Sequence, residues 1–275
     1  MQLHFPIRSD KLSMSVQVSS HIAHHQSTFQ TIDIYDTLVF GRVLFLDGHV
    51  QLAELDEHAY HESLVQIPLL NLVSPRRALV IGGGEGGLLR ELVRDRRLEE
   101  IHMVEIDQAV IDVCRDHLPG LSDGAFGSDR VSLFVEDAFP FVKRLSEPYD
   151  LIVMDSTDVY EEEDGGLSEQ LWTPDFYRDL HRLLAPNGFL VTQADNLLFC
   201  PYSLEGVLGT FGSVFGKTGH YQAIVPSFGG WSGFAWASHG ATMSATMPPS
   251  DRTFRYLNET TYALAFQPLP FKVGE

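Results

Sequence analysis

The segment that decides the fold is ALVIGGGEGGLLRELVRDRRLEEIHMVEID, residues 78–107. Its first four residues are apolar and predict a short buried strand, which runs directly into the glycine-rich loop GGGEGG. A helix is expected from about Leu88, and a second strand ends near Glu105. This order of strand, loop, helix and strand is typical of a nucleotide-binding unit, because glycines allow a sharp turn and let a ligand approach the backbone closely.

Two acidic residues limit the class of nucleotide that this unit can bind. Glu105 stands at the end of the second strand, where a carboxylate can accept hydrogen bonds from both ribose hydroxyls. Glu85 lies inside the glycine loop, where it would repel a pyrophosphate. An adenosyl sulfonium compound carries positive charge and no phosphate, so the loop favours that class of ligand over a dinucleotide.

Strand and helix patterns alternate after Ser74 and Pro75. Further strands are expected at 131–135, 151–155 and 189–194, followed by a late pair at 221–225 and 232–237. Helices are expected at 88–97, 108–117, 138–146, 173–185 and 203–215. Such alternation predicts an α/β fold with a mostly parallel sheet covered on both faces, and the late pair predicts a hairpin that closes one edge.

The N-terminal part follows a different pattern. Residues 28–52 alternate apolar and polar side chains, and the pair Asp47 and Gly48 predicts a tight hairpin turn. A helix is expected from about Asp56 to Leu70. The chain therefore divides into an N-terminal β-hairpin domain with its linking helix, residues 1–70, and an α/β domain, residues 71–275.

Charge is the unusual bulk property of this chain. The formal net charge is −18, so the surface repels nucleic acid backbones and concentrates cations instead. The first residues show no signal-peptide pattern, and no stretch approaches the roughly 18 apolar residues of a membrane helix. We therefore expect a cytoplasmic protein that binds neither nucleic acid nor membranes.

Cysteine and histidine spacing predicts no metal centre. Cys114 and Cys200 match no ligand spacing and are expected to be small buried residues. His21, His24 and His25 lie close together, but no acidic or cysteine residue accompanies them at ligand spacing. A solvated surface is therefore predicted for these three histidines.

The fourth strand of the predicted sheet ends in two carboxylates. The segment YDLIVMDSTD, residues 149–158, places Asp155 and Asp158 after a buried strand. Ligands of open α/β sheets bind beyond the carboxyl ends of the strands. One carboxylate can then accept a proton from an ammonium group while the other holds a second amine. The alternative is that both residues cap the following loop.

These segments together resemble the polyamine aminopropyltransferase family, which comprises spermidine synthase and its relatives. The segments that carry the resemblance are FGRVLFLDGHVQ, DEHAYHE, LVIGGGEGG, MVEIDQAVI, MDSTD, VTQAD, IVPSF and FRYLNETTYALAF. The resemblance spans nearly the whole chain. It implies a class I methyltransferase-like (Rossmann-like) sheet behind a small antiparallel domain, assembled as a homodimer or homotetramer.

The resemblance also implies a reaction. Decarboxylated S-adenosylmethionine would be the co-substrate, a small cationic amine the acceptor and 5′-methylthioadenosine the by-product, with no prosthetic group and no metal. The residues expected to bind the donor are Gln30, Gly82, Gly84, Glu85, Glu105, Asp137 and Ala138. Asp155 is expected to act as the base, with Tyr60 holding the attacking nitrogen. The residues expected to line the acceptor channel are His61, Asp158, Gln193 and Phe228.

Three positions depart from the pattern of enzymes that use putrescine. Glu85 stands where those enzymes usually carry aspartate, and Phe228 replaces a tyrosine that helps to hold the diamine. The loop after Asp155 reads STDVYEEEDGGLSE and lacks the usual DPxGP sequence. These departures favour spermidine or agmatine as the acceptor, or a permissive enzyme that also takes putrescine or cadaverine.

Two other functions remain open at this point. One is an S-adenosylmethionine-dependent amine N-methyltransferase, although the extra carboxylate of that donor would lie near Glu85 and Asp155. The other is a non-catalytic polyamine-binding homologue, which the altered loop and Phe228 support. A nicotinamide-dependent dehydrogenase fits less well because the glycine loop is acidic.

Overall fold

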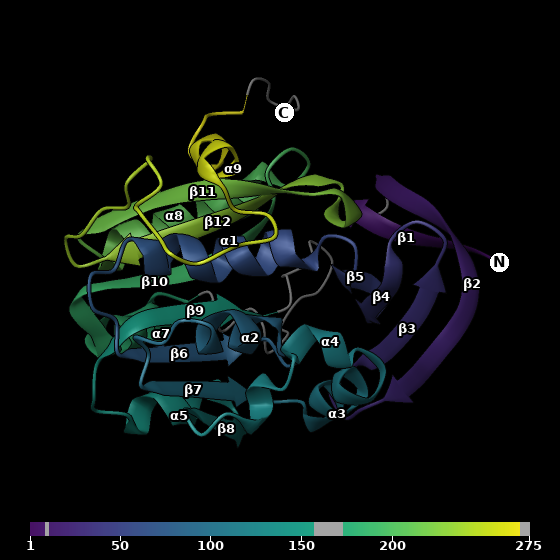
Figure 1. Ribbon diagram of the computed structural model, residues 1–275, viewed down its shortest axis with the longest axis horizontal. Coiled ribbons are helices and arrows are strands. Elements are labelled where there is room, and N and C mark those ends of the chain that lie inside the picture. Colours follow the sequence, from purple (N-terminus) through teal and green to yellow (C-terminus); the bar gives the residue numbers. More distant parts are fainter. Residues whose placement is uncertain (9–10, 157–172, 270–275) are drawn as a thin grey trace.

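The computed structural model describes residues 1–8, 11–156 and 173–269, which form two β-sheets (Figure 1). The first sheet is an antiparallel meander in the order β1-β2-β3-β4-β5. Its strands are β1 (Gln2–Arg8), β2 (Leu12–Gln26), β3 (Thr31–Thr37), β4 (Gly41–Leu46) and β5 (His49–Ala53). The predicted hairpin at Asp47 and Gly48 is confirmed, since φ is 48° and 80° at these residues, as a tight two-residue turn requires.

Sequence patterns did not predict β1 and β2. Only Val16 and Val18 are buried apolar side chains within the first part of β2, and the rest of that strand is mostly polar and exposed. Residues 12–18, LSMSVQV, alternate apolar and polar side chains and carry a strand signal that was overlooked, whereas residues 19–26, SSHIAHHQ, carry no such alternation. The pairing with β3 therefore forms without a strong local signal.

The second sheet has the order β11-β12-β10-β9-β6-β7-β8. Its strands are β6 (Arg77–Gly82), β7 (Glu100–Glu105), β8 (Val131–Val135), β9 (Tyr149–Asp155), β10 (Leu184–Asn196), β11 (Lys217–Val225) and β12 (Gly230–Ser238). Neighbouring strands from β10 to β8 run parallel, and β12 and β11 are antiparallel. The α/β fold and the late hairpin at one edge are thereby confirmed.

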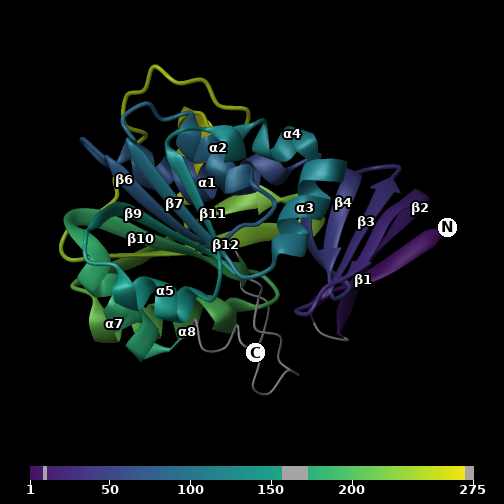
Figure 2. The same ribbon diagram turned by 90° about the horizontal axis from the view of Figure 1, so that it is seen from below.

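Helices cover both faces of the second sheet (Figure 2). The helices on one face are α1 (Glu57–Leu70), α2 (Gly87–Val93) and α9 (Glu259–Ala265), and those on the other are α5 (Ala138–Arg144), α7 (Pro174–Leu183) and α8 (Pro201–Val214). The helices α3 (Gln108–His117) and α4 (Pro119–Ser122) lie near the first sheet. Buried apolar residues of α3 contact those of β3 and β4 and so join the two sheets.

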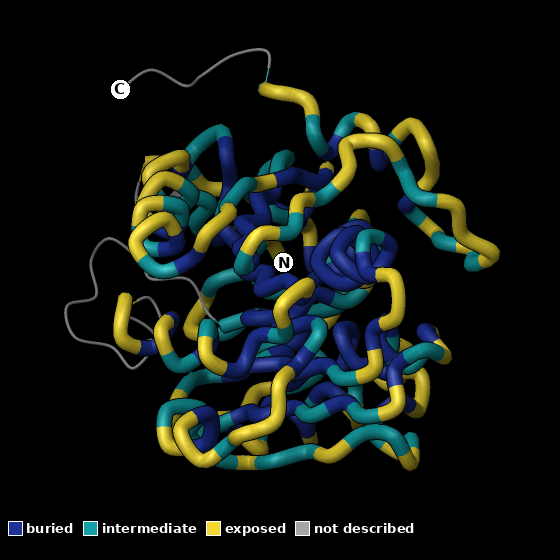
Figure 3. Tube along the Cα trace, turned by 90° about the vertical axis from the view of Figure 1, so that its left-hand side faces the viewer, coloured by how far each residue is buried: buried dark blue, intermediate teal, exposed yellow. Residues whose placement is uncertain are grey.

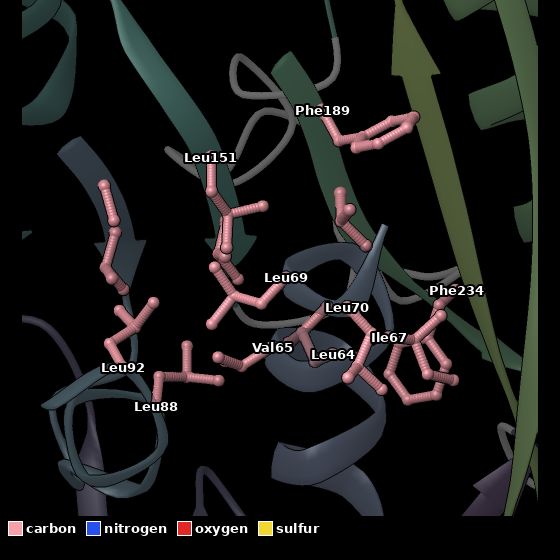
Figure 4. Close-up of a cluster of buried hydrophobic side chains, with 14 of the residues drawn as sticks. Leu64, Val65, Ile67, Leu69, Leu70, Leu88, Leu92, Leu151, Phe189 and Phe234 are labelled. Carbon is pink, nitrogen blue, oxygen red and sulfur yellow. The ribbon is translucent and has the colours of Figure 1, made fainter. Parts of the chain in front are cut away.

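Helix α1 is the central element of one helical layer. Its segment SLVQIPLL is buried on all sides, because the helix lies against the sheet and α2, and residues 252–257 contact it as well. Leu64 and Ile67 of α1, Leu88 and Leu92 of α2 and Phe234 of β12 belong to this cluster (Figure 4). Exposed stretches run around the outside of the chain and buried ones through its interior (Figure 3). The second half of α1 is therefore packed into the interior of the chain.

Several element boundaries differ from the sequence predictions. The helix predicted at 88–97 ends at Val93, where the backbone N–H groups of Arg94 and Asp95 donate to the carbonyls of Arg90 and Leu92. The strand predicted at 189–194 is longer, because Leu184 already pairs with Tyr149. The register shifts before Phe189, at the proline–asparagine–glycine segment 186–188. This segment interrupts the apolar pattern of the strand, so the pairing of Leu184 could not be predicted from periodicity.

Two further expectations concern single features. Cys114 and Cys200 are both buried, as predicted. In the part of the chain that the structure describes, no helix has the length and apolarity needed to cross a membrane. The division into residues 1–70 and 71–275 remains a prediction.

Candidate active site

The candidate site lies at the carboxyl ends of the parallel strands. Strand β6 runs between β9 and β7, with Gly82 opposite Asp155 and Ile81 opposite Val104. The chain proceeds from β6 to β7 and β8 on one side, whereas β9 and β10 lie on the other. Ligands of open α/β sheets bind where the strand order reverses in this way. The glycine loop, Glu105 and Asp155 thus share one edge.

The glycine loop contacts the end of β9 directly. Gly82 and Gly83 have φ of 83° and 74°, and the backbone N–H of Gly83 donates to the backbone oxygen of Asp155 at 3.2 Å. A Cβ atom on Gly82 would lie 2.1 Å from that same oxygen. Position 82 therefore requires glycine for two reasons, the left-handed backbone and the close approach of β9.

Replacing Gly82 by alanine is expected to lower both stability and activity. The added methyl group meets backbone that cannot move aside, and overpacking of this kind costs about 1–3 kcal/mol. Thermal unfolding of Gly82→Ala should show a fall in Tm on the order of 5 °C. Gly120→Ala is the matched control, since a Cβ atom there meets nothing within 4 Å. Equal Tm values for the two variants would contradict this account.

Asp155 is paired with a tyrosine from α1. The Tyr60 hydroxyl donates to Asp155 Oδ1 at 2.6 Å. Loss of solvent raises the pKa of Asp155 most and the Glu85 carboxylate raises it further, to about 7, although the Tyr60 hydrogen bond and the His61 charge act in the opposite direction. A general base works best when its pKa lies near the working pH. Asp155 is therefore suited to accept a proton near neutrality.

His61 lies between two carboxylates. Its side chain is 3% exposed, with Nδ1 2.7 Å from Glu57 Oε2 and Nε2 3.0 Å from Glu85 Oε1. Burial alone would lower the pKa of this imidazole, but the hydrogen bonds and charges of the two glutamates outweigh burial and raise the pKa to about 10. His61 is thus an imidazolium at neutral pH and donates to both carboxylates.

Glu57 and Gly87 hold His61 in place. Burial would raise the pKa of Glu57, but its contacts with His61 and Arg90 lower it to about 2. The Arg90 guanidinium donates to both Glu57 oxygens, at 3.0 and 2.8 Å. A Cβ atom on Gly87 would lie 2.3 Å from the imidazole, so the glycine at the start of α2 leaves room for the ring. By fixing the His61 ring, these contacts also orient Glu85, which accepts a hydrogen bond from His61 Nε2.

The cluster contains more carboxylates than cationic side chains. Glu57 is matched by Arg90, so the imidazolium of His61 is the positive charge nearest to both Glu85 and Asp155. The repulsion between these two carboxylates is one reason why the pKa of Asp155 is raised. An additional positive charge bound between them would relieve that repulsion. The cluster therefore favours a cationic ligand.

Glu105 ends β7 beside the glycine loop. Its Oε1 accepts from the backbone N–H of Asp107 at 2.9 Å. Burial raises the pKa of Glu105, and the charges of Glu85 and Asp107 contribute, to give about 7. A Cβ atom on Gly84 would lie 3.1 Å from Glu105 Oε2, so glycine keeps this carboxylate open on that side.

Gln30 reaches this edge from the first sheet. Its Nε2 donates to Asp107 Oδ2 at 3.1 Å, and the Ser27 hydroxyl donates to the same oxygen at 2.7 Å. The loop between β2 and β3 is thereby attached to the start of α3. Asp107 contacts both Gln30 and Glu105, so these two predicted donor-binding residues lie at the same edge, and their role in binding the donor stays a prediction.

Asp137 and Ala138 lie at the start of α5, after β8. The Asp137 side chain caps the helix by accepting from the backbone N–H of Phe139 at 2.8 Å. Strand β8 lies next to β7, with Val135 opposite Glu105. These two residues therefore stand further along the same edge as Glu105, as the sequence predicted.

Phe228 and Gln193 border the site from the antiparallel end of the sheet. The Phe228 ring meets the Tyr60 ring edge to face, with centroids 5.5 Å apart. Gln193 Nε2 donates to the backbone oxygen of Ser156 at 3.3 Å, next to Asp155. The structure thus groups these residues around Tyr60 and Asp155. Asp158 lies outside the described residues.

Sequence reasoning missed three residues of this cluster. Glu57, one helical turn before His61, could have been found from the i, i+4 spacing. Asp56 fixes the turn that carries Phe228, because it accepts from the backbone and hydroxyl of Ser227 at 2.7 and 2.8 Å. Arg90 contacts Glu57 only through the packing of α1 against α2, for which the sequence holds no local signal.

Comparison with protein families yields two matches. Residues 57–246 match the spermine/spermidine synthase domain, and residues 3–54 match the spermidine synthase tetramerisation domain. The chain is 35% identical to the polyamine aminopropyltransferase of Klebsiella pneumoniae (strain 342) over 266 residues, covering 94% of this chain and 91% of the relative. It is 38% identical to the polyamine aminopropyltransferase of Pectobacterium carotovorum subsp. carotovorum (strain PC1) over 221 residues, covering 80% and 75%.

Comparison with solved structures supports the same fold. A spermidine synthase in complex with the transition state analogue AdoDATO superimposes with a TM-score of 0.88 and 24% identity, covering 97% of this chain and 91% of that one. The spermidine synthase from Thermotoga maritima gives a TM-score of 0.85 and 23% identity, covering 98% and 91%. The two-sheet architecture is therefore shared along nearly the full length.

Proposed function

Because the chain belongs to the spermine/spermidine synthase family, we propose that it transfers the aminopropyl group of decarboxylated S-adenosylmethionine to an amine. The observation that carries this proposal is the Tyr60–Asp155 pair beside the Glu85 carboxylate. A proton acceptor with a pKa of about 7 next to an anionic side chain suits an amine nucleophile and a cationic donor. The other product is 5′-methylthioadenosine.

The donor binds along the carboxyl edge of the second sheet in this proposal. Glu105 accepts hydrogen bonds from the ribose, while Gln30 and the capped start of α5 at Asp137 and Ala138 border the nucleoside. The Glu85 carboxylate, held by His61, binds the amine of the aminopropyl tail. The open position at Gly84 supports close approach of the donor to Glu105.

The reaction is a displacement at the carbon beside the sulfonium. The amine nitrogen forms a bond to this carbon as the carbon–sulfur bond breaks, and the electron pair of the broken bond goes to sulfur. Because the sulfonium is already a good leaving group, the difficulty is to place two cations face to face. Glu85 and Asp155 reduce their repulsion. Asp155 accepts the proton of the amine, and Tyr60 orients that carboxylate.

Product analysis tests the proposed function. The protein is incubated with the decarboxylated donor and an equimolar mixture of putrescine, agmatine, spermidine and cadaverine, and the products are identified by mass spectrometry. We expect an aminopropylated amine together with 5′-methylthioadenosine. A parallel incubation contains intact S-adenosylmethionine, and methylated amines formed there would establish the N-methyltransferase instead. If neither incubation gives a product while calorimetric titration shows amine binding, the protein is a non-catalytic homologue.

The acceptor preference is proposed to depend on Phe228. We expect spermidine or agmatine to compete at least as well as putrescine, because Phe228 offers no hydroxyl beside Tyr60. In Phe228→Tyr, a hydroxyl could bond to the diamine, and a hydrogen bond to a charged group contributes about 1.5–3 kcal/mol. The kcat/KM for putrescine relative to spermidine should therefore rise by roughly tenfold, measured by competition between the two amines.

A matched variant controls for the added hydroxyl. Phe254 is partly buried against the hydrophobic core and faces the Arg252 guanidinium, so Phe254→Tyr should leave the ratio of the two kcat/KM values unchanged. An unchanged ratio in Phe228→Tyr would exclude Phe228 as the determinant. Putrescine as by far the best substrate of the unmodified protein would exclude the acceptor preference itself.

The proposal also covers the oligomeric state of the protein and its location in the cell. A homodimer or homotetramer is supported by the match of residues 3–54 to the tetramerisation domain, and analytical ultracentrifugation would measure its size. A cytoplasmic location remains a prediction. With a net charge of −18, the partners expected are small cations rather than nucleic acids.

A further inference from the structure

A histidine cluster on the first sheet includes an acidic residue that sequence spacing did not reveal. His21 and His24 lie on β2, and Asp33 comes from the adjacent strand β3. The predicted solvated surface is confirmed, because all three histidines are exposed, but two of them also contact an acidic residue. The strand pairing, not the local sequence, brings the carboxylate to them.

A β-bulge places both histidines on one face of the sheet. On a regular strand, residues three apart point to opposite faces. Here the register shifts between His21 and Ala23, so that His21 lies opposite Tyr35 and His24 lies opposite Asp33. Bulges often redirect a side chain in this way. The extra residue thus gives the two imidazoles and the carboxylate a common direction.

The three side chains converge closely. His21 Nε2 and His24 Nδ1 lie 2.7 and 2.9 Å from the same oxygen, Asp33 Oδ1, and all three atoms lie within 4.8 Å of one another. A tetrahedral zinc ion with bonds of about 2.0–2.1 Å separates its ligand atoms by about 3.3 Å. Small side-chain rotations would therefore admit an ion. The His21 ring stacks on Tyr35, with centroids 4.2 Å apart, which limits its orientations.

We propose that His21, His24 and Asp33 bind a divalent transition-metal ion, and that Zn²⁺ is the ion best matched to them. Two imidazole nitrogens and one carboxylate oxygen suit zinc and leave its fourth position for water. Each neutral imidazole then carries its proton on the nitrogen that does not bind the ion. The two histidine side chains are 38% and 60% exposed, so the ion reaches them from solvent.

Metal titration of the full chain tests this proposal. Zn²⁺ is titrated calorimetrically, and Co²⁺ is used as a spectroscopic probe of tetrahedral coordination. Loss of one ligand should weaken binding by at least the roughly 10- to 100-fold that loss of a supporting residue costs. His21→Ala, His24→Ala and Asp33→Asn should all show this loss, and Zn²⁺ should raise Tm only where the three residues are intact.

Two further variants make the result decisive. His25 adjoins His24 but points to the opposite face of β2, so His25→Ala should keep full affinity. His61, Glu85 and Asp155 are a second group that could hold an ion, and Glu85→Gln removes one of its ligands. Zn²⁺ binding that is lost in Glu85→Gln but kept in His21→Ala would overturn the proposal. Equal losses in His25→Ala and His21→Ala would overturn it as well.

Discussion

Asp155→Asn is expected to lower kcat by about 10²–10⁴-fold, the usual contribution of a general base, while donor binding is preserved. Asparagine keeps the size of the side chain and can still contact the Tyr60 hydroxyl, which lies 2.6 Å away. It cannot accept a proton from the attacking amine. Steady-state kinetics gives kcat, and calorimetric titration gives the Kd for 5′-methylthioadenosine.

The comparison variant for Asp155 is Asp175→Asn on α7, whose side chain is 88% exposed and should leave kcat unchanged. Tyr60→Phe should fall between the two, because it removes the orienting hydrogen bond and keeps the carboxylate. Equal losses of kcat and nucleoside affinity in Asp155→Asn would show that Asp155 supports the site instead of accepting a proton.

His61→Asn is expected to cause the largest loss of stability and to raise the KM for the donor. Removing one partner of a buried ionic group costs about 3–5 kcal/mol, and here Arg90 still matches Glu57, which favours the lower end. At about 2–4 °C per kcal/mol, Tm should fall by roughly 6–12 °C. Glu85 would lose the hydrogen bond that orients it. The KM for the donor should therefore rise more than kcat falls.

The pH dependence of the free energy of unfolding tests whether the charged His61 side chain stabilises the fold. Its pKa in the folded chain is about 10, above the ordinary 6.5, so its stabilising contribution is complete below pH 6.5 and is lost as pH rises toward 10. The free energy of unfolding, measured by chemical denaturation at several pH values, should decline across this range. In His61→Asn that decline should be smaller.

His220→Asn is the control for the pH experiment. Burial lowers the pKa of His220, so its contribution changes below pH 6.5 and not above it. The decline between pH 6.5 and 10 should therefore persist in His220→Asn. The same slope in His61→Asn as in the unmodified protein would contradict an imidazolium between Glu57 and Glu85.

Much of this architecture could be predicted from local patterns. The glycine loop, the apolar strand before it and Glu105 at the end of the next strand all have strong signals, and the structure places them at one edge. The turn at Asp47 and Gly48 was equally clear, because only a few residue pairs adopt that backbone. These features depend on neighbours in the sequence.

The features that escaped prediction depend on contacts between distant segments. Arg90 meets Glu57 because two helices pack together, and Asp33 meets His21 because a bulge shifts a strand. That His61 lines the acceptor channel stays a prediction, and the structure adds that both of its ring nitrogens contact glutamates. Its role therefore depends on Glu57, which the sequence alone did not single out.

The backbone contact between Gly82 and Asp155 has a consequence for how this enzyme can be changed. The loop that receives the donor and the strand that carries the base are in contact through main-chain atoms, so a displacement of one backbone segment would displace the other. Phe228, by contrast, reaches the site on a short turn that is tied to Asp56 by side-chain hydrogen bonds. Substitutions intended to change acceptor specificity should therefore begin at this turn, because it is separate from the glycine loop that is proposed to bind the donor.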